Sequence, residues 1–270
     1  NHDGMRHIPR LLPALLTISL LAAPLQLPAQ RAAVEGGHGM VTSVHELATQ
    51  AGVEILKKGG NAVDASVATG LALAVVYPFA GNIGGGGFMM IHLADGGAGG
   101  DRAGRDIAID YRETAPAAAS RDMYVGPDGK VLQGPGSSTV GWKASGVPGS
   151  VAGFALAMQK YGSGKVTWAD VIEPARRLAA EGHAVSQWTA ANLRAYAKLF
   201  EPFAESKKSY LKDGAFRQAG ELWVQADLAA TFTRLQKNGP REFYEGETAR
   251  LIAAAMARHG GNITLTDLKN

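Results

Sequence analysis

The apolar positions in the first third of the chain follow a helical period. Between residues 45 and 58, Leu47, Ala51 and Ile55 recur at spacings that place them on one face. Gly59-Gly60 follows directly, and paired glycines are typical of the end of a helix because they adopt the conformations that terminate it. The pattern therefore predicts an amphipathic helix over 45–58.

The next segment has no polar face. Residues 62–76 read AVDASVATGLALAVV and are apolar on all sides, which is typical of a helix covered by other elements all round. Asn61 is suited to cap this helix, and Asp64 three places later favours its N-terminus. Pro78 ends it. We therefore predict the central helix of a layered domain.

Two short strands are predicted after this helix. Residues 88–94, FMMIHLA, form an apolar run, and residues 107–113, IAIDYRE, form a second run that is rich in β-branched side chains. The connection between them, DGGAGGDRAGRD, is polar and rich in glycine, so the strands are predicted to pair as a hairpin with a long loop. We interpret His92, inside the first strand, as a core histidine and not as a metal ligand.

The remaining chain is predicted to be mostly helical. Its expected elements are a helix fed by the tight turn GVPG before Ser150, a helix capped by Thr167 with Asp170 and kinked at Pro174, a helix from Ser186 to near Phe200, an extended stretch over 209–224 with a turn at Asp213-Gly214, helices at about 226–237 and 246–259, and a helix start at Thr264.

The N-terminal residues are interpreted as a targeting segment and not as part of the fold. A short basic stretch with Arg6 and Arg10 precedes the apolar run LLPALLTISLLAAPLQLPAQ, which is the layout of a secretory signal peptide. Residues 1–30 are therefore expected to be signal peptide and leading residues, and residues 31–270 the folded domain. The mature protein is expected in the periplasm or secreted, with no membrane attachment after the signal is removed.

Composition excludes several classes of function. The 270 residues include 27 basic and 24 acidic side chains, a net charge of +3, and the basic residues do not cluster, which argues against nucleic-acid binding. The absence of cysteine excludes disulfides, thiolate metal sites and a cysteine nucleophile. The stretch HELAT at His45 lacks the second histidine of a zinc-protease helix, and no Gly-x-Ser-x-Gly motif occurs.

Four consecutive glycines, Gly84–Gly87, stand before the first strand. They do not match the Gly-x-Gly-x-x-Gly spacing of a dinucleotide site, because position 89 is methionine. The run also lies between a helix and the strand that follows it. A phosphate loop has the opposite order, strand before helix, because the helix N-terminus must face the anion. We therefore interpret them as a loop that packs closely against other backbone.

One polar cluster is a candidate site. The stretch IDYRETAP places charged side chains at the end of the second strand, and Arg112 within it is suited to hold a carboxylate through two parallel hydrogen bonds. From the residues alone, a structural salt bridge is the preferred interpretation of Arg112, with ligand binding as the alternative.

Taken together, these motifs resemble a known family, the large subunit of the γ-glutamyltranspeptidases. The resemblance extends from Gly37 to Lys269 and is carried by four stretches: GGNAVDASVATGLALAVVYPFAGNIGGGGFMMIH, AIDYRETAP, GVPGSVAGFALAMQKYG and NGPREFYEGETARLIAAAM. It implies an α+β fold, the four-layer αββα sandwich of N-terminal-nucleophile hydrolases, here incomplete because only the large-subunit part is present.

The resemblance also implies an activity. Family members cut their own precursor, and the new N-terminal threonine of the small subunit attacks the γ-glutamyl amide of glutathione or a related donor, with its own amine as base. The γ-glutamyl group then passes to water, an amino acid or a dipeptide, without a cofactor or metal. The expected partners are the γ-glutamyl substrate and the small subunit.

Two site residues carry over from the family to this sequence. Arg112 matches the arginine that binds the α-carboxylate of the donor, which reverses the preference for a salt bridge, and Glu113 beside it is expected to steady the site. No catalytic residue is expected within the chain, because the nucleophilic threonine belongs to the small subunit, so the chain alone is expected to be inactive. The alternatives are a non-catalytic secreted remnant that binds small peptides, and a related cephalosporin or glutaryl acylase.

Overall fold

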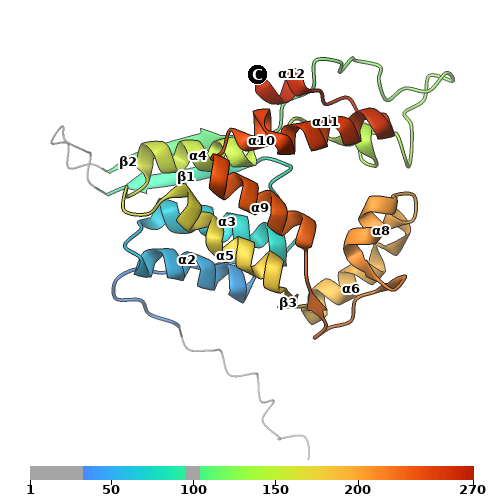
Figure 1. Ribbon diagram of the computed structural model, residues 1–270. Helices are drawn as coiled ribbons and strands as arrows, with labels where there is room; N and C mark the ends of the chain where they lie inside the picture. The colour runs from blue at the N-terminus through green and yellow to red at the C-terminus, as the bar shows by residue number, and fades with distance from the viewer. Residues whose placement is uncertain (1–32, 95–103) are drawn as a thin grey trace, which may run out of the picture. The chain divides into compact units, whose positions relative to one another are not determined.

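The computed structural model describes residues 33–94 and 104–270. The chain divides into two units, residues 1–38 and residues 39–270. The described part of the first unit, residues 33–38, carries no helix or strand, and every described element lies in the second unit (Figure 1). The predicted signal peptide, residues 1–30, lies outside the described residues.

The first two helices form where the apolar pattern predicts them. Helix α2 spans Glu46–Lys57 and buries one face, and helix α3 spans Ala62–Val76 and is buried along nearly its whole length. Helix α3 begins with a reciprocal capping box, because the side chain of Asn61 accepts the Asp64 N–H and the side chain of Asp64 accepts the Asn61 N–H. The predicted central helix is confirmed.

Strands β1, Phe88–Leu93, and β2, Arg105–Asp110, pair antiparallel as the predicted hairpin. Their register places Phe88 opposite Asp110 and Leu93 opposite Arg105. Ile91 and Ile109 are buried on one face of this hairpin, toward the helices. We call the other side the open face; its side chains are exposed and belong to Phe88, Met90, His92, Asp106, Ala108 and Asp110.

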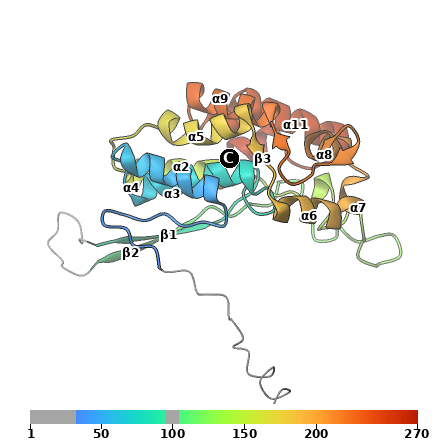
Figure 2. The same ribbon diagram turned by 90° about the horizontal axis from the view of Figure 1, so that it is seen from below.

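The helices that pack around α3 lie on the buried side of the hairpin (Figure 2). Helix α3 contacts α2, α4 (Ser150–Tyr161) and α5 (Trp168–Glu181), while α5 also contacts α9 (Ala226–Asn238). The core lies between these helices and the hairpin, and its largest fully buried side chains include Phe232, Ile55 and Leu71. The fold is therefore α+β, with a helix layer on one side of the hairpin.

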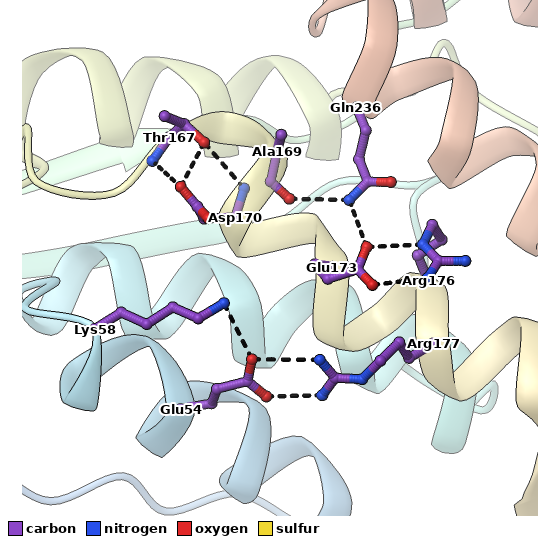
Figure 3. A network of polar contacts seen from close by, with 9 residues as sticks. All are labelled: Glu54, Lys58, Thr167, Ala169, Asp170, Glu173, Arg176, Arg177 and Gln236. Atoms are coloured by element: carbon purple, nitrogen blue, oxygen red, sulfur yellow. Dashed lines mark hydrogen bonds and ion pairs between the residues drawn. The ribbon is translucent and has the colours of Figure 1, made fainter.

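A polar network joins three helices of this layer (Figure 3). Glu173 of α5 accepts two hydrogen bonds of 2.7 Å from Arg176 and one of 2.8 Å from Gln236 of α9. Arg177 of α5 donates at 2.8 Å to Glu54 of α2. The bond from Gln236 links α5 to α9 and the bond to Glu54 links α5 to α2, and both involve a charged partner, which strengthens them.

The remaining helices and strands follow after residue 141. They are η1 Trp142–Ala144, β3 His183–Ala184, α6 Gln187–Ala195, α7 Ala197–Phe200, α8 Ala204–Tyr210, β4 Leu211–Lys212, β5 Ala215–Phe216, β6 Leu222–Trp223, α10 Glu242–Glu245, α11 Glu247–His259 and α12 Leu265–Lys269. Strand β3 pairs with β6, and β4 pairs with β5 through the predicted turn at Asp213-Gly214.

Three predictions of local structure are wrong. Helix α8 occupies residues 204–210, where the extended stretch was expected to begin at 209, and the helix expected to reach Phe200 is divided into α6 and α7. His92 is not a core residue, because its side chain is 65% exposed on the open face, with Nδ1 2.7 Å from Asp106. Its strand is apolar on both faces, so the sequence does not reveal which face is covered.

Within the described residues, no helix is both long enough and apolar enough to cross a membrane.

Candidate functional site

The candidate site lies where β2 ends. The strand stops at Asp110, three residues earlier than predicted, so Tyr111, Arg112 and Glu113 belong to the segment that leaves it. Tyr111 still exchanges backbone hydrogen bonds with Gly87, at 3.0 and 3.3 Å, and Thr114 pairs with Val147. The backbone is therefore held on both sides of Arg112.

Glycines surround this segment at contact distance. A Cβ on Gly86 would lie 2.7 Å from the Glu113 nitrogen, and one on Gly146 would lie 2.7 Å from the Glu113 Cβ. A Cβ on Gly149 would collide with the carbonyl of Tyr111, and one on Gly153 with its ring. Only glycine lets these chains approach so closely.

The glycine run itself is fixed to helix α4. The Gly85 carbonyl accepts hydrogen bonds from the N–H groups of Gly149 and Ser150, at 2.8 and 2.9 Å. This confirms the prediction that the run packs against other backbone, with one exception: a Cβ on Gly84 would meet nothing within 4 Å. The run is a scaffold that aligns the start of α4 with the end of β2.

Arg112 has a defined position although its side chain is 61% exposed. Its Nε lies 3.1 Å from Glu113 Oε2, and its backbone N–H donates at 3.0 Å to Asp110. Its Cζ lies 5.8 Å from the centroid of the Phe88 ring. Within the described residues, the two terminal nitrogens of the guanidinium have no hydrogen-bond partner, so they are available to an incoming anion.

Glu113 is held in its charged form. A hydrogen bond from its own backbone N–H lowers the pKa of the Glu113 carboxyl, and bonds from Arg112 and the Gly86 N–H act in the same direction, while partial burial opposes them. The structure thus brings together the two predicted site residues, Arg112 and Glu113.

A cleft of about 420 Å³ opens beside Arg112. It is bounded by the start of α4, by α10 and by α12, and its lining includes Gly149, Tyr244 and Lys269. The Tyr244 hydroxyl accepts a 3.0 Å hydrogen bond from the Ala152 N–H, in the first turn of α4, and burial raises the pKa of Tyr244 to about 12. Tyr244 therefore stays neutral and serves as a cap for α4, which has no side-chain cap of its own.

Two contacts of the site were not predicted from the sequence: the ring of Phe88 beside Arg112, and the hydroxyl of Tyr244 on α4. The only sequence signal for either is an aromatic residue within a family motif, GFMMIH for the first and EFYEG for the second. Among the described residues, no group of three or more histidine, aspartate or glutamate side chains is arranged to hold a metal ion.

The chain matches known proteins over most of its length. A family model described as gamma-glutamyltranspeptidase matches residues 48–270. The glutathione hydrolase proenzyme of Escherichia coli (strain K12) is 45% identical over 240 residues, which are 87% of this chain and 39% of that protein. The proenzyme of Pseudomonas sp. (strain A14) is 44% identical over 94% of this chain and 43% of its own length.

Solved structures give the same result for the fold. The γ-glutamyltranspeptidase of Helicobacter pylori superposes with a TM-score of 0.81 at 42% identity, over 88% of this chain and 65% of that chain. A cephalosporin acylase from Bacillus halodurans superposes with a TM-score of 0.76 at 27% identity, over 90% and 44%. The chain spans about two fifths of the length of the curated relatives named above.

Proposed function

The chain belongs to the γ-glutamyltranspeptidase family, and from this premise we propose that it is the large-subunit part of an enzyme that hydrolyses or transfers γ-glutamyl groups. Glutathione is the proposed donor, as the names of the relatives suggest, and water, amino acids or dipeptides are the proposed acceptors. The fold is the αββα type of its structural relatives, of which this chain supplies one helix layer and a hairpin.

In this proposal, Arg112 binds the α-carboxylate of the donor. The observation that carries it is the guanidinium itself: Glu113 holds Nε at 3.1 Å, and the two terminal nitrogens point to no partner among the described residues. A carboxylate can therefore accept two parallel hydrogen bonds from these nitrogens, an arrangement with directional specificity. Glu113 steadies the arginine and partly balances its charge before the donor arrives.

The remaining chemistry is assigned to the part of the family's length that this chain does not span. That part is proposed to supply a threonine nucleophile, released by self-cleavage, which attacks the γ-glutamyl carbonyl and expels the amine. The acyl-enzyme then passes its γ-glutamyl group to water or an amine. By holding the α-carboxylate, Arg112 contributes to donor binding equally in the ground and transition states, so its contribution appears in KM.

The open face is the proposed contact surface for that part. The side chains of Phe88 and Met90 are 63% and 71% exposed, although they lie on a hairpin whose opposite side is buried. Apolar side chains on one side of a two-stranded sheet favour a covering layer.

The predicted signal peptide supports export to the periplasm or the medium for the assembled enzyme.

The test uses the complete protein, by which we mean this chain together with the counterpart of the length it does not span. Arg112→Lys is expected to raise the KM for γ-glutamyl-p-nitroanilide roughly 10- to 150-fold, because losing a charge-assisted bond costs about 1.5–3 kcal/mol. The kcat is expected to stay near wild type, since the carboxylate is held equally in ground and transition states. Self-cleavage, read on a gel, is expected to be normal.

The matched control is Arg121→Lys, an exposed arginine whose Nε lies 3.8 Å from Asp122. It is expected to leave both constants unchanged. A normal KM in a fully cleaved Arg112→Lys enzyme would remove Arg112 from the donor site and return it to a structural salt bridge. Turnover of a glutaryl anilide, which lacks the α-amino group, in preference to the γ-glutamyl anilide would favour the acylase alternative.

A further inference from the structure

We infer that Phe88 is a positioning residue for Arg112: its ring fixes the plane of the guanidinium that receives the donor carboxylate. This inference rests on the proposed function of Arg112. It concerns a residue of the open face, which the family resemblance does not assign to the site and which the core of this chain does not require.

The hairpin register brings the two side chains together. Phe88 lies opposite Asp110, and Arg112 follows Asp110 by two positions, which is the spacing that returns a side chain to the same face of an extended chain. The Cζ of Arg112 lies 5.8 Å from the centroid of the Phe88 ring, within the range of a cation–π contact. Within this chain the ring is 63% exposed, so the core of this chain does not hold it; in the complete protein the layer proposed to cover the open face lies against it.

Two neighbouring side chains then orient the guanidinium. Glu113 binds Nε at 3.1 Å and fixes one edge, while the Phe88 ring, whose centroid lies 5.8 Å from Cζ, limits the rotation of the group about that edge. The two terminal nitrogens have no hydrogen-bond partner among the described residues. A long, largely exposed arginine otherwise samples many rotamers, and binding would have to select one of them. The ring reduces that selection before the donor arrives.

A double-mutant cycle in the complete protein tests the inference, with kcat/KM for γ-glutamyl-p-nitroanilide as the readout. Phe88→Leu keeps an apolar side chain but loses the ring, and it is expected to raise KM about two- to fivefold with kcat unchanged. Phe88→Tyr keeps the aromatic ring, and its KM is expected to equal that of the wild type. Added to Arg112→Gln, which carries no charge, Phe88→Leu is expected to change kcat/KM by less than about 1.5-fold.

The outcomes separate this inference from the proposed function. If Arg112→Gln alone leaves kcat/KM normal, the role of Arg112 is wrong. If Arg112→Gln impairs the enzyme but Phe88→Leu has no effect, or has the same effect in both backgrounds, Phe88 does not act through Arg112 and the inference is overturned. Phe88→Met, which also lacks a ring, replaces Phe88→Leu in the cycle if the leucine variant fails to mature.

Discussion

The ion pair between Glu173 and Arg176 within helix α5 is expected to contribute to the free energy of unfolding, by an amount that depends on pH. Glu173 receives two hydrogen bonds from Arg176 and one from Gln236, across the contact between α5 and α9 (Figure 3). The bonds from Arg176 are the main cause that lowers the pKa of Glu173 from 4.5 to about 2, and Gln236 adds to the effect while burial opposes it. The charged carboxylate is therefore stabilised in the folded state.

The sign and size of the effect follow from this pKa. The unfolded chain takes up the proton at higher pH than the folded one, so the stabilisation is complete above pH 4.5 and is lost as the pH falls toward 2. The full shift corresponds to at most about 3 kcal/mol. Because the side chain of Glu173 is 31% exposed, solvent screening reduces this, and we expect Glu173→Gln to lower the free energy of unfolding by about 1–2 kcal/mol at pH 7.

The assay is urea unfolding of wild type and Glu173→Gln in the complete protein at pH 7, 5, 4 and 3, followed by tryptophan fluorescence. Trp168 reports on the same helix pair, because its Nε1 donates to the Leu235 carbonyl at 3.2 Å. The control, Glu181→Gln, removes the same charge at the end of the same helix. The difference between wild type and Glu173→Gln should shrink steadily below pH 4.5. An equal difference at pH 7 and pH 3 would refute the electrostatic explanation.

Two further predictions concern packing and acid stability. Gly149→Ala places a methyl group against the Tyr111 carbonyl and is expected to lower the free energy of unfolding, measured in urea, by about 1–3 kcal/mol. The control Gly84→Ala, with open space around it, should change that free energy by less than about 0.5 kcal/mol. Equal effects of the two variants would contradict the close-packing argument. Burial lowers the pKa of His183 from 6.5 to about 4, so the unfolded state binds the proton first and stability falls, by about 1–3 kcal/mol, between pH 6.5 and 4. His183→Gln should lack that fall, and a parallel decline in both proteins would assign it to other groups.

Local signals explain how much of the fold could be predicted from the sequence. Helices α2 and α3 begin and end within a residue or two of the predicted bounds, because their caps, glycines and apolar periods are all adjacent in the chain. Helix α8, AESKKSY, has no buried residue, so its sequence carries no apolar period, and only the weak preference of alanine, glutamate and lysine for helix indicates it.

The candidate site also has features that the sequence predicts and features that it does not. Arg112 and Glu113 could be named in advance, because the motif that contains them is contiguous. The contact between Arg112 and Phe88 could not, because it depends on the register of two strands whose connection does not reveal which residues pair. His92 was misplaced for a related reason: only the assembled helix layer decides which face of β1 is covered.

The glycines around residues 111–113 also determine how the protein can diverge. The approach of the Gly85–Gly87 loop to α4 and to Tyr111 is made by main-chain atoms, so it does not depend on the identity of neighbouring side chains. Apolar residues elsewhere in the helix layer can be exchanged over evolutionary time while Arg112 keeps its place. A single added methyl group at Gly86 or Gly149 forces that backbone apart. The position of Arg112 thus depends on glycine residues, which have no side chain.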